Sequence, residues 1–199
     1  MYIALKDDGF WSEPLAMRSM WRDVWDWHKL TDAQRAEHGW YPLREVGAAF
    51  DPLTQTRSPP SYELGGDDVV TATYVVTYDA ALAAESVNAE HDRRALLGRA
   101  FPVEGVGDVP LEGSEKTQVV LLALKDTARD LRDAGVTAAL LMFTDRDGTD
   151  RRMNAVQMIA LVNAGKAWMQ QVHEAKRALK EMDPIPADFA DDRHWPPIA

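Results

Sequence analysis

The feature that most constrains the fold is a stripe of apolar residues near the end of the chain. Residues 155–182 contain no proline, and apolar side chains recur there at alternating steps of three and four. This spacing keeps one face of a helix apolar over several heptads. The sequence therefore predicts a helix about 40 Å long, which ends before Pro184. The stripe consists of Met158, Leu161, Gly165, Trp168, Val172, Ala175, Leu179 and Met182.

A narrow apolar stripe on a charged helix needs another element to cover it. The strands expected nearby are short, so they cover only the part of the helix that carries Ile159 and Val162 beside the stripe. The rest is left to a helix expected over residues 80–97 or to a helix of a neighbouring copy. The sequence favours neither of these two partners.

The other elements of the second half have clear start and stop signals. Residues 80–97 are rich in Ala, Leu, Glu and Arg and are followed by a glycine, which predicts a helix. Ser114 is the expected N-cap of a further helix that ends before Gly135. The expected strands, of which the last two are joined by an Asp-Gly hairpin turn, are residues 101–103, 109–111, 138–144 and 149–153.

The first part of the chain predicts a small module rich in tryptophan. Five of the seven tryptophans lie before residue 41. Thr31 and Gln34 match a capping box that opens a short helix over residues 32–38. Residues 69–78 have the Val, Thr and Tyr content of a strand.

Trp21 and Trp25 are one helical turn apart, so they share a face if residues 19–27 are helical. Exposed indole rings stack on sugars, which would suit a glycan-binding surface. Tryptophan also dominates the cores of small modules and the centres of protein interfaces. We therefore favour a core or a protein–protein interface over a glycan platform.

These patterns together predict an α+β fold without internal repeats. The closing segment has four prolines and no periodicity, which predicts an extended arm. The expected parts are a Trp-rich β-containing module (1–79), a helical connector (80–99), a helix–hairpin–long-helix domain (100–183) and a Pro-rich C-terminal arm (184–199).

Charge and composition exclude several classes of function. The formal net charge is −10, and binding to nucleic acid or an anionic membrane requires clustered cations. The longest stretch without a charged residue, 153–165, is shorter than the roughly 20 apolar residues that a membrane-spanning helix needs. The chain has no cysteine, so a disulfide, a thiol nucleophile and a Cys-ligated metal are excluded. We expect no nucleic-acid partner and no membrane insertion.

The residue patterns also predict no catalytic, cofactor or metal site. Asp145, Asp147 and Asp150 surround a glycine, but the bidentate Glu of a calcium loop is missing, so a hairpin turn is favoured. The five histidines are scattered and form no zinc motif. A Gly-x-Ser-x-Gly nucleophile elbow and a complete phosphate loop are both absent from the sequence. We therefore expect a protein that is not an enzyme.

Two regions resemble a known family. In the second half these are Gly-Val-Gly-Asp-Val-Pro-Leu (105–111), Phe-Thr-Asp (143–145) and Met-Asn-Ala-Val-Gln-Met-Ile-Ala-Leu (153–161). They resemble an uncharacterised C-terminal domain family of tail and tail-fibre proteins of tailed bacteriophages and prophages. Residues 30–43, with Trp-Tyr-Pro-Leu at their end, are similar to the N-terminal module that often precedes that domain. The resemblance implies a virion component assembled in the bacterial host cytoplasm, and it brings no catalytic residues.

The sequence and the resemblance together predict a non-enzymatic connector or attachment adaptor in the tail tip, baseplate or fibre. Its expected partners are other tail proteins and further copies of itself. Two alternatives stay open: a module that binds a host receptor or glycan, and a tail-fibre assembly chaperone. The expected interface residues are Trp21, Trp25, Trp168, Leu179, Phe189 and Trp195.

Overall fold

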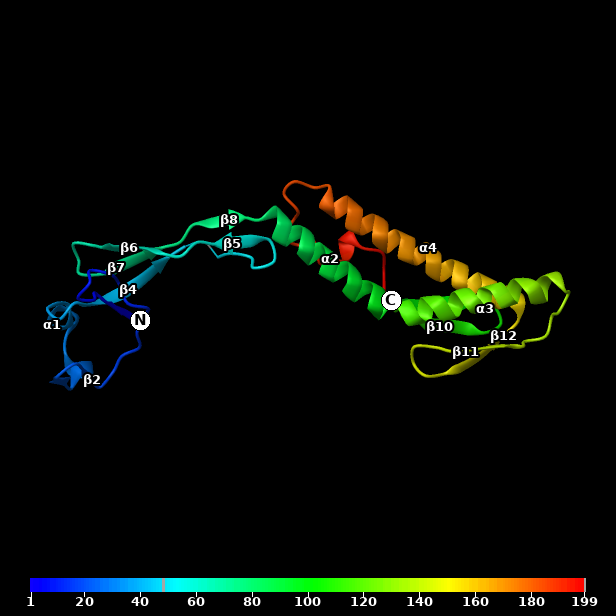
Figure 1. The fold of residues 1–199 in the computed structure, drawn as a ribbon, viewed down its shortest axis with the longest axis horizontal. Coiled ribbons are helices and arrows are strands. Elements are labelled where there is room, and N and C mark those ends of the chain that lie inside the picture. The colour runs from blue at the N-terminus through cyan, green and yellow to red at the C-terminus, as the bar shows by residue number, and fades with distance from the viewer. Residues whose placement is uncertain (48, 199) are drawn as a thin grey trace. The chain divides into compact units, whose positions relative to one another are not determined.

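In the computed structural model the chain divides into two units, Met1–Asp79 and Ala80–Ala199 (Figure 1). The structure describes residues 1–47 and 49–198, so Ala199 of the predicted arm lies outside the described residues. Helices and strands both occur, and the predicted α+β class is confirmed. The two units have separate cores and are described in turn.

The first unit is built on a four-stranded sheet in the order β1–β4–β7–β6. β4 and β7 run parallel, and the two outer pairs are antiparallel. Trp27 and Trp40 are fully buried against Ala4 and form the centre of the core. The sheet strands are β1 (Tyr2–Ala4), β4 (Trp40–Val46), β6 (Ser61–Leu64) and β7 (Val70–Thr73). The remaining elements are β2 (Met20–Trp21), β3 (Val24–Trp25), β5 (Gln55–Arg57), β8 (Val76–Tyr78), η1 (Trp27–Lys29) and α1 (Asp32–Ala36).

The predicted capping box is present at the start of α1. The Thr31 hydroxyl accepts from the Gln34 N–H at 3.2 Å, and the Gln34 side chain accepts from the Thr31 N–H at 2.9 Å. One turn later Arg35 is buried, and its guanidinium donates to the carbonyls of Trp27 and His28 and to the Asp32 carboxylate. This buried cation ties α1 to the tryptophan core.

Trp21 and Trp25 do not share a helical face, and one expected strand of the first unit is divided in two. Residues 19–27 form the hairpin β2–β3 followed by a 3₁₀ turn, because Arg22 and Asp26 have positive φ values of 49° and 57° that no helix contains. The single strand expected over residues 69–78 is two strands. It changes partner at Tyr74 and Val75, so that β7 pairs with β4 and β6 while β8 pairs with β5.

The second unit contains the three helices and the Asp-Gly hairpin predicted for it. Its elements are α2 (Ala80–Leu97), β9 (Arg99–Val103), β10 (Gly107–Leu111), α3 (Glu115–Asp133), β11 (Leu141–Thr144), β12 (Asp150–Met153), α4 (Ala155–Lys180) and η2 (Asp192–His194). β9 pairs with β10 and β11 with β12, each antiparallel.

The apolar stripe on α4 is covered from within the same unit. α2 and α3 both pack along α4, as Figure 1 shows for the green and orange helices. Five stripe residues are buried, whereas Met182 lies beyond the helix and is exposed. The intramolecular alternative therefore holds, and α2 is a packed helix of this unit. The buried stripe residues are Met158, Leu161, Trp168, Val172 and Leu179.

The C-terminal arm folds back onto its own unit, and the expectation of an extended free arm is wrong. Ile185, Phe189 and Trp195 are buried. The Trp195 indole N–H donates to the Phe189 carbonyl at 2.7 Å, which closes the arm into a compact turn. Three large apolar side chains gain more by burial here than they would in an exposed strand along the surface.

Arg94 on α2 fixes the arm in place. Its side chain is 1% exposed, and its Nε donates to Glu90 at 2.6 Å. Its Nη2 donates to the Ala190 carbonyl at 2.8 Å and to Asp192 at 2.9 Å, and the guanidinium lies 5.2 Å from the centre of the Trp195 ring. Desolvation raises the pKa of Glu90, but hydrogen bonds from Arg93 and Arg94 outweigh it and hold that pKa below its usual value. A charged pair therefore lies under the arm.

The Asp-Gly hairpin is organised by Asp145, whose side chain is buried. One carboxylate oxygen accepts from the N–H groups of Asp147 and Thr149 at 3.0 and 2.9 Å, and the other accepts from Arg151 at 2.9 Å. Burial raises the pKa of Asp145, but the hydrogen bonds from Thr149, Arg151 and Asp147 together place it below its usual value. Asp145 is therefore a structural acceptor of the turn.

The buried arm predicts that Phe189→Ala destabilises the second unit by about 3–5 kcal/mol, the usual cost of removing a buried aromatic side chain. Urea unfolding followed by tryptophan fluorescence measures this loss. Leu140→Ala is the control within the same unit, because Leu140 is 63% exposed and its truncation should change stability by less than about 0.5 kcal/mol. Equal stability of the Phe189→Ala variant and the parent protein would show that the arm does not pack in solution.

The hairpin predicts a pH-dependent effect of Asp145→Asn. At pH 7 this variant should be less stable by about 1.5–3 kcal/mol, because hydrogen bonds to an ionised acceptor are lost. Since the folded-state pKa is depressed, the carboxylate stabilises fully above its usual value of 3.8, and the difference should shrink as the pH falls below it. Thermal unfolding between pH 7 and pH 2.5 measures this trend. Asp147→Asn, at an exposed ion pair with Arg146, should cost less than about 1 kcal/mol.

Candidate functional site

A pocket of about 330 Å³ opens in the second unit among α2, β9, β10, α3 and α4. Its volume is near the lower end of ligand-binding pockets, which range over about 300–1,000 Å³. Its floor is apolar and buried, so any ligand or side chain that enters it leaves water. The floor consists of Phe101, Leu111, Leu121, Val162 and Trp168.

Two glycines shape the walls of this pocket. Gly165 is a stripe position of α4 without a side chain, and a Cβ there would lie 3.5 Å from Leu111. Gly113 lies so close to α2 that a Cβ would be 2.4 Å from the Ala95 carbonyl oxygen. The end of β10 and the residues after it can therefore approach α2 and α4 closely. A larger side chain at position 165 would fill part of the pocket.

Polar groups stand beside the apolar floor. The His91 Nδ1 lies 2.8 Å from the Asp92 carboxylate, and its Nε2 is buried without a hydrogen-bond partner in the described part of the chain. The His173 ring lies edge-on to it at 5.7 Å between ring centroids. Neutral His91 that donates through Nδ1 presents Nε2 as an acceptor. The wall of the pocket is therefore mixed, because Gln118, Lys166 and Gln170 line it together with the two histidines.

Glu112, directly after β10, is the carboxylate among the residues that line the pocket. It accepts from the hydroxyls of Ser114 and Thr117, each at 2.8 Å. These hydrogen bonds lower the pKa of Glu112 against a smaller opposing effect of burial. The carboxylate is therefore ionised at neutral pH and occupied in capping α3.

One basic residue, Lys166, lines the pocket, and two others line a neighbouring depression. Lys166 lines both this pocket and a second depression, which is also lined by Lys125 and Arg129. Desolvation lowers the pKa of Lys125, with smaller effects of the same sign from Arg129 and Lys166. These three side chains form a local basic patch, with Asp126 as the one carboxylate among the residues that line the depression.

Four of the six predicted interface residues are buried inside the second unit. Trp168 lines the pocket, and its indole N–H donates to the Pro197 carbonyl at 3.2 Å. Leu179, Phe189 and Trp195 lie in the core between helices and arm. They are taken up within their own chain, so the expectation that they are exposed to a partner is wrong.

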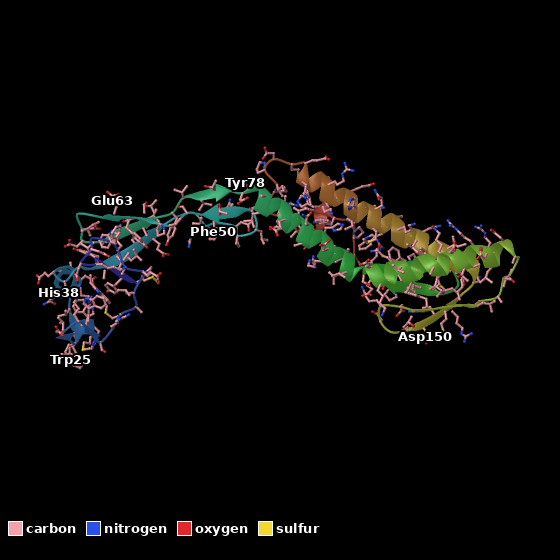
Figure 2. The ribbon with its side chains drawn as sticks, in the orientation of Figure 1. Trp25, His38, Phe50, Glu63, Tyr78 and Asp150 are labelled. Atoms are coloured by element: carbon pink, nitrogen blue, oxygen red, sulfur yellow. The ribbon has the colours of Figure 1, made fainter. Side chains whose placement is uncertain are left out.

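The other two predicted residues lie on the hairpin of the first unit and differ sharply in exposure. Trp21 is half-buried, with its ring 4.9 Å from that of Trp40. Trp25 is 76% exposed, and Figure 2 shows it beside β2 at the margin of the unit. Trp25 is therefore the predicted interface residue that remains available to a partner.

Metal binding and membrane crossing find no support in the described residues. No group of three or more His, Asp or Glu side chains there is placed to hold a metal ion. Within the same residues no helix combines the length and the apolar character that spanning a bilayer needs.

Sequence reasoning missed the pocket and the two buried arginines, Arg35 and Arg94. A sign of the pocket was available, because Gly165 interrupts a stripe of large apolar residues. No local pattern marks Arg94, since its partners Ala190 and Asp192 are nearly one hundred positions away. From the sequence alone, a charged residue on a helix such as Arg94 is expected to face solvent, because its distant partners in the arm are not evident.

Comparison with known proteins identifies one relationship. Neither the curated proteins nor the solved structures include a significant match to this chain. A family described as a domain of unknown function, DUF4376, matches residues 78–192 and thus more than half of the chain. The matched region includes α2 to α4 and ends at the first residue of η2, so it contains every element around the pocket. The chain belongs to the DUF4376 family.

Proposed function

We propose that this protein is a non-enzymatic structural component of a bacteriophage tail, in the tail-tip, baseplate or fibre region. It acts there as a connector or attachment adaptor through protein–protein contacts. The tail context rests on the resemblance of residues 30–43 and 105–161 to phage tail proteins. On this proposal the protein is assembled in the host cytoplasm and kept in the virion.

The observation that best supports an adaptor is the exposure of large apolar side chains in the first 25 residues. Trp25 is 76% exposed and Phe10 is 71% exposed, and Met20 on the same hairpin as Trp25 is 42% exposed. Such side chains are costly to leave in water, and aromatic residues and Met are enriched at the centres of protein interfaces. A protein that contacts neighbours through its first unit would use them.

The division of the chain suits two separate attachments. The first unit presents exposed apolar side chains, and the second presents a pocket beside a basic patch. Each unit has its own core, so contact at one does not require the other to unfold. The partners proposed are other tail proteins and further copies of this chain.

The glycan-binding alternative also draws on Trp25, since an exposed indole can stack on a sugar ring. Asp23 and Asp26 lie beside it in the sequence and could accept from sugar hydroxyls. Trp21 and Trp40 pack on each other, so the hairpin does not present a row of exposed rings. We therefore favour the protein contact over the glycan contact.

Particle composition tests the proposal. Mass spectrometry of purified phage particles should detect the protein at a fixed ratio to other tail proteins, and Trp25→Ala should lower its incorporation several-fold, because a central aromatic anchor is lost. Val75→Ala is the control, since Val75 is exposed on the same unit away from the hairpin.

Two results would contradict the proposal. Presence in infected cells together with absence from particles would favour the chaperone. Normal incorporation of the Trp25→Ala variant, combined with loss of cell attachment, would favour the receptor or glycan module.

A further inference from the structure

The depression between α3 and α4 collects three positive charges. Lys125 and Arg129 come from consecutive turns of α3, and Lys166 comes from α4, which packs against α3. These cations form the basic patch of the second unit, on a chain whose formal net charge is −10. Asp126 is the one carboxylate among the residues that line the depression, so positive charge exceeds negative charge there.

None of the three cations forms an ion pair within the described residues. Other cations on the same helices are paired, as Arg132 is on α3 and Arg177 is on α4. Lys125 donates instead to the neutral side-chain amide of Asn163 on α4. The patch therefore keeps unneutralised charge, although the chain has more carboxylates than cations.

The three charges are held together against their mutual repulsion. Lys125 and Arg129 are four residues apart on α3, and like charges at this spacing destabilise a helix. Desolvation is the largest effect that lowers the pKa of Lys125, and the charges of Arg129 and Lys166 lower it further. An anion from outside the chain would relieve this repulsion.

The surroundings of the patch suit carboxylates better than phosphate. Phosphate sites usually add backbone N–H groups from a loop or a helix N-terminus. Lys125, Arg129 and Lys166 lie inside long helices, where the backbone N–H groups are bonded along the helix. The planar guanidinium of Arg129 matches a carboxylate through two parallel donors. Lys125 and Arg129 are about 6 Å apart along the helix axis, which is the spacing of carboxylates one turn apart on another helix.

Exposed apolar side chains continue from the depression along α3. Leu122 lines the depression and is 47% exposed, and Val119, three residues earlier, is 61% exposed. Residues at this spacing lie on the same side of a helix. A segment that contacts the basic patch therefore also meets an apolar surface, and protein interfaces combine both kinds of contact.

We propose that the basic patch and the adjoining apolar side chains bind an acidic amphipathic helix of a partner protein. Carboxylates one turn apart on that helix contact Lys125, Arg129 and Lys166, and its apolar residues pack on Val119 and Leu122. This inference gives the chemistry of one partner of the adaptor and rests on the proposed function.

Titration calorimetry on the full chain at 50 mM NaCl tests the chemistry of the site. The probe is a synthetic helical peptide with Glu pairs and Leu pairs at i, i+4 spacing, and its control peptide has Gln in place of every Glu. The double variant Lys125→Gln, Arg129→Gln should bind the Glu peptide about 10-fold more weakly than the parent protein, because two surface ion pairs are lost. Binding to the parent protein should also weaken at 500 mM NaCl.

A matched double variant controls for net charge. Lys176→Gln combined with Arg177→Gln removes the same charge from α4 outside the depression, and it should bind as the parent protein does. Equal weakening by the two double variants, equal binding of the Glu and Gln peptides, or no binding of the Glu peptide would overturn the proposal. Displacement of the peptide by inorganic phosphate, at the ionic strength of the chloride buffer, would assign the patch to a free anion and overturn it as well.

A stability measurement separates a binding role from a structural one. The double variant Lys125→Gln, Arg129→Gln should unfold at the same urea concentration as the parent protein or at a higher one, because the repulsion within the patch is relieved. A clearly lower midpoint would show that these charges stabilise the fold, which contradicts the assigned role.

Cross-linking in purified particles identifies the partner. A carbodiimide joins a lysine amine directly to a carboxylate in contact with it, so Lys125 or Lys166 should be joined to an Asp or Glu of another chain. Lys176 should not be, and the internal pair of Lys29 with Asp26 shows that the reagent has reacted. Peptide binding in solution together with absence from particles would refute the tail proposal alone. Presence in particles without a cross-link from either patch lysine would refute this site alone.

Discussion

The second unit depends on a buried guanidinium that joins two segments far apart in the sequence, α2 and the arm. Arg94 extends from α2, neutralises Glu90 one turn earlier and donates to the backbone of the arm at Ala190. Removal of one partner from such a pair leaves an uncompensated buried charge, which usually costs 3–5 kcal/mol. The arm, α2 and the core around Trp195 are therefore stabilised together.

The first unit uses the same kind of interaction on a smaller scale. Arg35 is buried beside Trp27 and donates to two backbone carbonyls and to Asp32. Its guanidinium also lies 5.3 Å from the centre of the Tyr2 ring, so it reaches the first strand as well. In both units a planar cation with several donors connects aromatic side chains to backbone carbonyls.

Local signals predicted most of the secondary structure of the second unit. The N-cap at Ser114, the Asp-Gly turn and the spacing along α4 each act within a few residues, and the structure contains the corresponding elements. The prediction of an extended arm was wrong because proline content describes only the local backbone. It gives no information about the burial of Phe189 and Trp195. The hairpin at Trp25 was not predicted, because the spacing of Trp21 and Trp25 gives no sign of the positive φ at Arg22 and Asp26. The pocket could be anticipated only in part, through Gly165, since its other walls come from β10 and α3.

The contact between Arg94 and the arm also constrains when the second unit can fold during synthesis. The residues that cover α2 emerge from the ribosome about one hundred positions after α2 itself. Until the arm is synthesised, Glu90 and part of the apolar side of α4 stay exposed to solvent. A core that depends on contacts so distant in the sequence folds slowly. The first unit contains no segment beyond Asp79 and can fold earlier. The nascent chain therefore carries a folded first unit while the core of the second unit still waits for residues 185–195.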